Sequence, residues 1–263
     1  MSQFLSRVVV TLVALPVVLA IVHYGDWWLF GLALLAALVG LHELYAMARS
    51  LRPLVLAGYA GAVATLLGAH LGGVEWMLGG FVLTLLLAFL LYGIAETRQS
   101  GTITMGSTLL GVTWIPLGLA HLLLLRDIPE HAELAVFTVL LAVFADDTAA
   151  YLVGRLLGRH KLAPALSPGK TWEGFLAGTA AAVAVAFFAL YEQGFLTIAE
   201  SIVLGAAIAL AGAAGDLFES ALKRDLQVKD SGRLLGGHGG MLDRIDALLF
   251  AGPAALYVVL ALA

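Results

Sequence analysis

Residues 78–94 read LGGFVLTLLLAFLLYGI, an apolar run without a single charged side chain. About 20 apolar residues in a helix cross the hydrocarbon core of a bilayer. The run is continuous, as is 180–191, and this favours helices over the alternating strands of a membrane barrel. Similar runs recur through the whole chain of 263 residues, of which 61% are hydrophobic and only 12% are charged. The sequence therefore predicts an all-α, polytopic integral membrane protein.

Breaks in the apolar pattern divide the chain into nine predicted transmembrane helices. They are 5–23, 27–47, 53–71, 75–95, 103–125, 133–154, 172–191, 198–219 and 244–262. The first five form an N-terminal transmembrane region, 1–130. The other four form a C-terminal region, 131–263, with two long loops at 154–171 and 220–243. The chain has no cysteine, which excludes disulfides and thiolate chemistry.

The basic residues give the predicted orientation. When nine spans are drawn, thirteen of the fourteen Lys and Arg residues fall on one side of the membrane, and only Arg126 falls on the other. Loops rich in Lys and Arg stay in the cytosol. We therefore expect a cytosolic N-terminus, an external C-terminus, and both long loops in the cytosol.

Charge is concentrated in one stretch, 215–246, which reads GDLFESALKRDLQVKDSGRLLGGHGGMLDRID. It holds six carboxylates and five basic groups in a chain that is otherwise almost uncharged. Unpaired charges in hydrocarbon are expensive, so these groups must meet water, ions or one another. The stretch is therefore the first place to look for function.

Helical spacing brings several of these charged groups together. If the eighth span continues to about Lys223, then Asp216, Glu219 and Lys223 share one face with Ser220. Asp243 and Asp246 form a second acidic face at the start of the ninth span. Carboxylates with basic neighbours suit a divalent cation and the phosphates that it bridges. A set of interfacial salt bridges that only fixes a loop is the alternative that spacing leaves open.

The same stretch carries a specific resemblance. Ser220-Ala-Leu-Lys-Arg, then Lys229-Asp230, Gly232 and finally His238-Gly-Gly-Met-Leu-Asp-Arg-Ile-Asp246 resembles the signature of phosphatidate cytidylyltransferases, the CDP-diacylglycerol synthases. The match covers every specified position over 27 residues, and Gly236 stands where proline is commoner. Upstream, four further segments resemble cytosolic elements of the family: 147–151, 154–155, 158–164 and 167–174. The N-terminal half resembles the family only in its pattern of spans, with Glu43 as an exception.

The resemblance implies that the C-terminal region transfers a cytidylyl group from CTP to phosphatidate, giving CDP-diacylglycerol and pyrophosphate in phospholipid biosynthesis. The implied catalytic residues are Asp147, Lys223, Arg224, Lys229, Asp243 and Arg244. The implied substrate-binding residues are Ser167, Lys170, Thr171, Trp172, Glu173, Ser220, His238, Gly239 and Gly240. The implied metal ligands are Asp216, Asp243 and Asp246, with Mg²⁺ as the cofactor and K⁺ as a second candidate ion.

Two details of these assignments rest on local sequence. Asp146 precedes Asp147 where the family usually has a small residue, and we assign the catalytic role to Asp147. Residues 167–171 are expected to form a turn that leads into a helix at Trp172, where backbone donors favour an anion. The Gly-Lys-Thr within this turn is not a nucleotide P-loop, because the first glycine and the preceding strand are missing.

The expected partners are CTP, phosphatidate and membrane lipids, with a second copy of the chain as a candidate and no nucleic acid. The expected location is the inner (cytoplasmic) membrane, with the active site facing the cytosol. Two other functions stay open from the residues alone. A CTP-dependent lipid kinase would use similar sites but transfer the γ-phosphoryl group. A secondary transporter would use the intramembrane carboxylates to bind a coupling ion.

Overall fold

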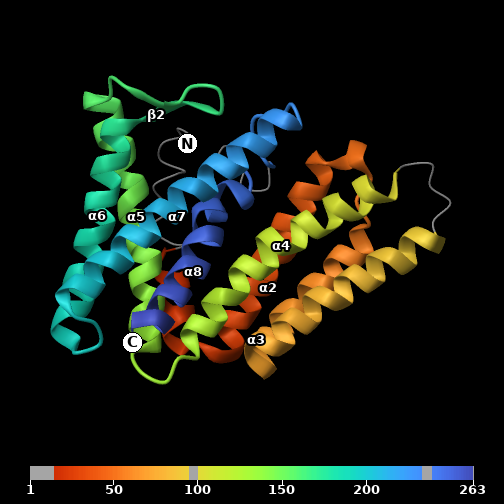
Figure 1. The fold of residues 1–263 in the computed structure, drawn as a ribbon, viewed down its shortest axis with the longest axis horizontal. Helices are drawn as coiled ribbons and strands as arrows, with labels where there is room; N and C mark the ends of the chain where they lie inside the picture. The colour runs from red at the N-terminus through yellow and green to blue at the C-terminus, as the bar shows by residue number, and fades with distance from the viewer. Residues whose placement is uncertain (1–14, 95–99, 233–238, 263) are drawn as a thin grey trace. The chain divides into compact units, whose positions relative to one another are not determined.

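The computed structural model describes residues 15–94, 100–232 and 239–262, and within these ranges the chain is almost entirely helical (Figure 1). The helices are α2 Asp26–Met47, α3 Val55–Ile94, α4 Gly101–Arg126, α5 Ala132–Leu157, α6 Trp172–Leu190, α7 Ile198–Asp225 and α8 Leu242–Leu262. Two 3-10 turns follow α2 and α6, η1 Arg49–Leu51 and η2 Tyr191–Gln193. The predicted all-α membrane fold is confirmed.

Seven of these helices are long and apolar enough to cross a membrane, and a shorter apolar helix covers Leu15–Tyr24. The 40-residue α3 contains a non-helical residue, Gly73, with φ 68° and ψ −153°. A left-handed φ suits glycine because it has no Cβ. The predicted spans 53–71 and 75–95 are the two limbs on either side of this break. The count of about nine spans is consistent with these helices, and the start of the first span lies outside the described residues.

The chain divides into two compact units, 1–124 with 228–244, and 125–227 with 245–263. In the first unit α2 packs against α3, and the two limbs of α3 fold back on each other. Glycines permit this close approach, since a Cβ on Gly80 would lie 2.5 Å from the backbone nitrogen of Thr65. The unit includes the buried side chains of Leu41, Leu44 and Leu66.

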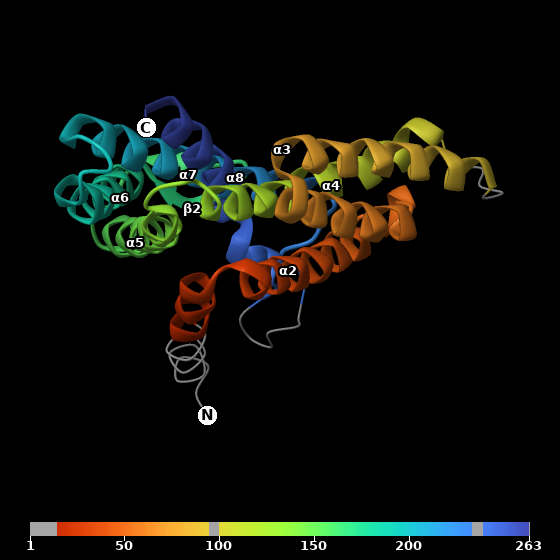
Figure 2. The same cartoon turned by 90° about the horizontal axis from the view of Figure 1, so that it is seen from below.

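In the second unit α5, α6 and α7 pack side by side (Figures 1 and 2). Small residues allow these helices to approach closely. A Cβ on Gly174 of α6 would lie 2.6 Å from the Ala150 carbonyl oxygen of α5, and a Cβ on Gly205 of α7 would lie 2.6 Å from Cα of Val183. Helix packing therefore accounts for these two glycines.

A two-stranded antiparallel hairpin joins α5 to α6, with β1 at Lys161–Ala163 and β2 at Ser167–Thr171. The expected turn over 167–171 is therefore wrong, because these residues pair with β1 as a strand. The helix does begin at Trp172, as predicted, and Thr171 is its N-cap, with a side-chain oxygen that accepts from the Gly174 N–H at 3.2 Å. The last residue of the hairpin is thus also the N-cap of α6.

Candidate active site

The centre of the charged cluster in the second unit is an ion pair between two elements. Lys170 lies on β2, and its Nζ contacts Asp216 Oδ2 on α7. The two side chains are partly exposed, at 24% for Lys170 and 32% for Asp216. A partly exposed pair can exchange its partner for a ligand at lower cost than a fully buried pair. The hairpin therefore brings a lysine ammonium, at the end of a flexible side chain, to a carboxylate that water can reach.

Three further carboxylates of this unit lie close enough to act on the ion pair or on one another. Asp146 of α5 interacts electrostatically with Lys170 and Asp216. Asp246 of α8 interacts with Asp216, Asp147 and Lys223. Four carboxylates from three helices thus converge with two ammonium groups. Like charges held this close favour a bound cation, because each carboxylate destabilises the others.

Asp146 and Asp147 are adjacent residues of α5 that differ in exposure. Asp146 is buried, and the position of a Cβ on Gly178 would overlap its Oδ1, so α6 covers this carboxylate. Asp147 is exposed. A substrate reaches an exposed carboxylate more readily than one beneath a helix, which is in keeping with the catalytic role assigned to Asp147.

The last turns of α7 carry the predicted basic residues. The helix continues to Asp225, so the expected face of Asp216, Glu219 and Lys223 forms on one helix. Lys223 Nζ lies 2.5 Å from Oε2 of Glu219, whose side chain is buried. Arg224 is exposed, and its Nε donates to the Leu166 carbonyl of the hairpin at 3.2 Å. Positive side chains at a helix C-terminus also match the helix dipole.

Two other predicted binding residues, Thr171 and Glu173, have structural partners at the start of α6. Glu173 accepts from the His160 ring at 2.6 Å and from the His160 backbone N–H at 3.2 Å, which ties the start of the hairpin to α6. Thr171 is buried as the cap of α6, whereas Trp172 is exposed. Ser167 begins β2 opposite Ala163, and Ser220 is half-buried on α7.

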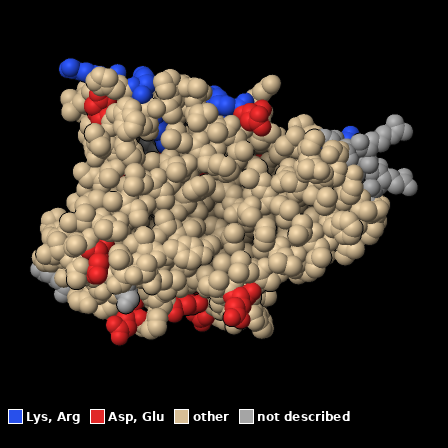
Figure 3. Space-filling view, in the orientation of Figure 1, with Lys and Arg blue, Asp and Glu red and all other residues tan. Residues whose placement is uncertain are grey.

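Basic side chains gather at the hairpin end of this unit, where Figure 3 shows Lys and Arg atoms at the surface. Arg155, Arg159 and Lys161 are all exposed there. Arg155 at the end of α5 donates to the Tyr151 hydroxyl at 2.9 Å. This end therefore presents positive charge to anions that approach the unit.

The first unit holds the predicted residues at the start of α8. Oδ2 of Asp243 accepts from the N–H of Gly240 at 2.8 Å, and from the hydroxyl and N–H of Ser231 at 2.9 and 3.2 Å. Gly239 has a φ of 79°, a conformation that favours glycine. Lys229 and Arg244 are exposed. The predicted substrate-binding residue His238 lies outside the described residues.

Glu43 is a residue of this unit that the resemblance singled out without implying a role for it. It lies on α2 and is only 5% exposed, and its carboxylate accepts from the N–H groups of Met241 and Leu242 at 3.0 and 2.9 Å. The signals in the sequence were that resemblance and the position of a carboxylate in an otherwise apolar span. Its partners lie 198 and 199 residues away, beyond the reach of any local pattern.

The side chains fit the ion that the resemblance implies. Carboxylate oxygens are the ligands that Mg²⁺ takes in proteins, and it usually keeps waters and substrate phosphates in the rest of its shell. Asp216 and Asp246 supply such oxygens in the second unit. Over the ranges 15–94, 100–232 and 239–262, no group of three or more His, Cys, Asp or Glu side chains is arranged to hold a metal ion by itself.

The long apolar helices define an integral membrane protein, and its second unit holds a cluster of carboxylates and lysines. The model of the Cytidylyltransferase family matches residues 5–262, and the chain belongs to this family. The resemblance seen in the signature is thereby confirmed over nearly the whole chain.

Several relatives are named phosphatidate cytidylyltransferase. The one from Staphylococcus haemolyticus is 33% identical over 254 residues, which are 94% of this chain and 95% of the relative. The one from Staphylococcus epidermidis is 34% identical over 94% of this chain and 95% of the relative. The one from Mycobacterium bovis is 33% identical over 85% of this chain and 78% of the relative. These matches favour neither the lipid kinase nor the transporter.

Proposed function

We infer that this chain is an enzyme that transfers a cytidylyl group from CTP to phosphatidate, giving CDP-diacylglycerol and pyrophosphate. The family match and the names of the relatives support this reaction. The structural observation that supports this function most directly is the Lys170–Asp216 ion pair, which lies among carboxylates of three helices. Such a cluster can exchange internal ion pairs for the phosphates of a nucleotide.

The reaction needs no covalent enzyme intermediate. A phosphate oxygen of phosphatidate attacks the α-phosphorus of CTP and forms a new P–O bond. The bond from the α-phosphorus to the oxygen that bridges it to the β-phosphorus breaks, and pyrophosphate leaves with that electron pair. Catalysis then consists mainly of positioning the reactants and neutralising charge that develops on the phosphates.

We assign the neutralising role in the second unit to basic groups around the cluster. The ammonium groups of Lys170 and Lys223 lie beside carboxylates. Each is at the end of a flexible stem and can rotate towards a bound phosphate. Arg224 is exposed and offers a planar fork that suits phosphate oxygens. Lys229 and Arg244 are catalytic residues that the resemblance implies, and we assign them to the phosphates of the substrates.

Asp216 and Asp246 are proposed to hold Mg²⁺, and Asp243 is the third ligand that the resemblance implies. When bound, the ion supplies charge neutralisation at the phosphates. Asp147 is proposed as the exposed acid that helps to orient the reactants. We propose K⁺ as a second ion, which is monovalent, and assign no residue to it.

The protein is an integral membrane protein, and we propose that its site faces the cytosol from the inner membrane. The concentration of basic residues on one side of the predicted spans supports this orientation. A lipid phosphate at headgroup depth would then meet a soluble nucleotide without leaving the bilayer. Accessibility labelling tests the orientation: a label at position 165 should react from the cytosol and one at 263 from outside, and the opposite pattern would contradict it.

Membrane lipids and a second copy of the chain complete the proposed partners. Cross-linking in native membranes tests the second copy. A single species of monomer mass at every cross-linker length would contradict a homodimer.

A product assay tests the reaction. Purified protein in lipid vesicles with phosphatidate, CTP and Mg²⁺ should release pyrophosphate and form a cytidine-linked lipid, and ATP should substitute poorly. Changing both Lys223 and Arg224 to Ala should abolish the product. Release of CDP with a doubly phosphorylated lipid would instead identify a kinase.

A further inference from the structure

The buried carboxylate of Glu43 lies outside the residues assigned to the reaction, yet it is fully engaged with the start of a catalytic helix. Its Oε1 accepts from the Met241 N–H at 3.0 Å, and its Oε2 accepts from the Leu242 N–H at 2.9 Å. The first N–H groups of a helix have no partner within the helix. Glu43 thus caps α8 from a different helix, α2, which is far away in the sequence.

The same carboxylate is joined to Asp243 through one serine. The Ser231 hydroxyl lies 3.2 Å from Oε2 of Glu43 and 2.9 Å from Oδ2 of Asp243. Asp243 in turn accepts from the Gly240 N–H, so it satisfies the amide that precedes those capped by Glu43. Three consecutive N–H groups, from Gly240 to Leu242, are therefore held by two carboxylates that share a serine.

The backbone is shaped to reach this carboxylate. A Cβ on Gly232 would overlap Oε1 of Glu43, and one on Gly240 would overlap both Oε2 of Glu43 and the Ser231 hydroxyl. Glycine at these two positions allows the backbone to approach Glu43 closely. The two glycines thus serve a close contact between the backbone and this carboxylate.

We propose that Glu43 is a positioning residue of cytidylyl transfer. It fixes the first turn of α8 and, through Ser231, the carboxylate of Asp243 beside Arg244. This inference rests on the proposed function, because Asp243 and Arg244 are assigned to that reaction. It gives the N-terminal region a part in catalysis without contact between Glu43 and a substrate.

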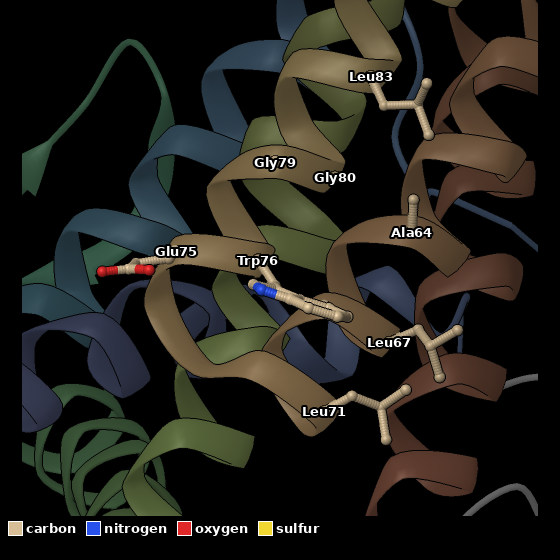
Figure 4. Close-up of a pocket in the computed structure, with 9 residues that line it drawn as sticks. Ala64, Leu67, Leu71, Glu75, Trp76, Gly79, Gly80 and Leu83 are labelled. Atoms are coloured by element: carbon tan, nitrogen blue, oxygen red, sulfur yellow. The ribbon is translucent and has the colours of Figure 1, made fainter.

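The test compares Glu43→Gln with a matched control. Glutamine keeps the size of the side chain but has a single acceptor oxygen, so one of the two buried N–H groups faces an NH₂ donor and loses its partner. Glu75→Gln makes the same chemical change on α3, where Glu75 is exposed and points away from the other side chains that line an apolar cavity of about 370 Å³ (Figure 4).

Hydrogen exchange of the peptide that contains Met241 and Leu242 gives a readout without catalysis. Glu43→Gln should speed exchange of these amides, whereas amides of α6 keep their rate and Glu75→Gln changes neither. In the product assay, Glu43→Gln should lower kcat/KM by about 10–100-fold, the usual effect of losing a partner that orients a site residue. Part of that loss should be a higher KM for CTP.

A merely structural role would reduce the amount of active enzyme and leave KM unchanged. Unchanged exchange, or faster exchange with wild-type KM and kcat per folded protein, would therefore overturn the inference. If Glu43→Gln fails to fold, Ser231→Ala serves instead, with the same direction of change in exchange and KM, and wild-type values for it would be equally contradictory. If the unmodified protein makes no cytidine-linked lipid, the proposed function fails, and the exchange comparison still decides whether Glu43 holds the start of α8.

Discussion

The carboxylates of Glu43 and Asp216 have different kinds of partner, and the difference separates architecture from chemistry. Glu43 is buried and accepts from backbone N–H groups, which cannot move away without unwinding a helix. Asp216 is partly exposed and faces the ammonium of Lys170, at the end of a flexible stem. A backbone partner fixes a position, whereas a side-chain partner can be exchanged for a ligand. We therefore expect activity to be most sensitive to the second kind of contact.

The largest expected effect is that of Asp216→Asn. Removing one charge from a preorganised electrostatic site typically costs on the order of 10²–10³ in kcat. Magnesium-dependent turnover should fall by at least this much, and Asp246→Asn should act in the same way, while thermal unfolding in detergent stays close to that of the unmodified protein. Asp225→Asn, an exposed change at the end of the same helix, is the matched control and should leave turnover unchanged. Near-normal activity of Asp216→Asn at limiting Mg²⁺ would remove this residue from the metal site.

The next effect is that of Lys170→Met. The change keeps most of the aliphatic stem but removes the ammonium that pairs with Asp216. The apparent KM for CTP should rise and kcat/KM should fall by about 100-fold, as expected for one lost contact to a charged group. Lys161→Met on the other strand of the hairpin removes an exposed ammonium and should have little effect. Equal losses for the two lysines would mean that the hairpin acts through general positive charge.

A smaller difference should separate the adjacent acids of α5. Asp147→Asn should reduce turnover about tenfold more than Asp146→Asn does, because only Asp147 is exposed to a ligand. Steady-state kinetics of the two single variants, normalised to folded protein, measure this ratio. The reverse order would show that the buried Asp146 is the catalytic acid.

The smallest effect is expected for an ordinary local cap. Thr197 and Glu200 form a capping box at the start of α7, with hydrogen bonds of 3.3 and 2.7 Å between neighbouring residues. Thr197→Ala should lower stability by about 1 kcal/mol, seen as a lower unfolding temperature, and leave KM for CTP unchanged. A raised KM in this variant would contradict the idea that the cap supplied by Glu43 acts on the site whereas this local cap does not.

Local patterns predicted the parts of the molecule that depend on neighbours in sequence. Helical spacing placed Asp216, Glu219 and Lys223 on one helix, and α7 continues past all three to Asp225. The apolar pattern also located the start of α8 close to Asp243. Each of these features is decided within a few residues.

The hairpin and the role of Glu43 were missed for physical reasons. Strands β1 and β2 have three and five residues, and the second contains Pro168 and Gly169, which are typical of turns. Their pairing depends on register across a tight connection. Glu43 reads as one polar residue in an apolar span, and its purpose depends on N–H groups almost two hundred residues later. Such long-range contacts leave no periodic signal in the sequence.

The most direct test of the central claim follows the two ends of the CTP phosphate chain separately. Purified protein is given phosphatidate, Mg²⁺ and CTP labelled at either the α- or the γ-phosphorus. Cytidylyl transfer predicts that the α-label enters the lipid, that the γ-label appears only in pyrophosphate, and that neither label moves in Asp216→Asn. Entry of the γ-label into the lipid, or lipid labelling that survives in Asp216→Asn, would contradict the account.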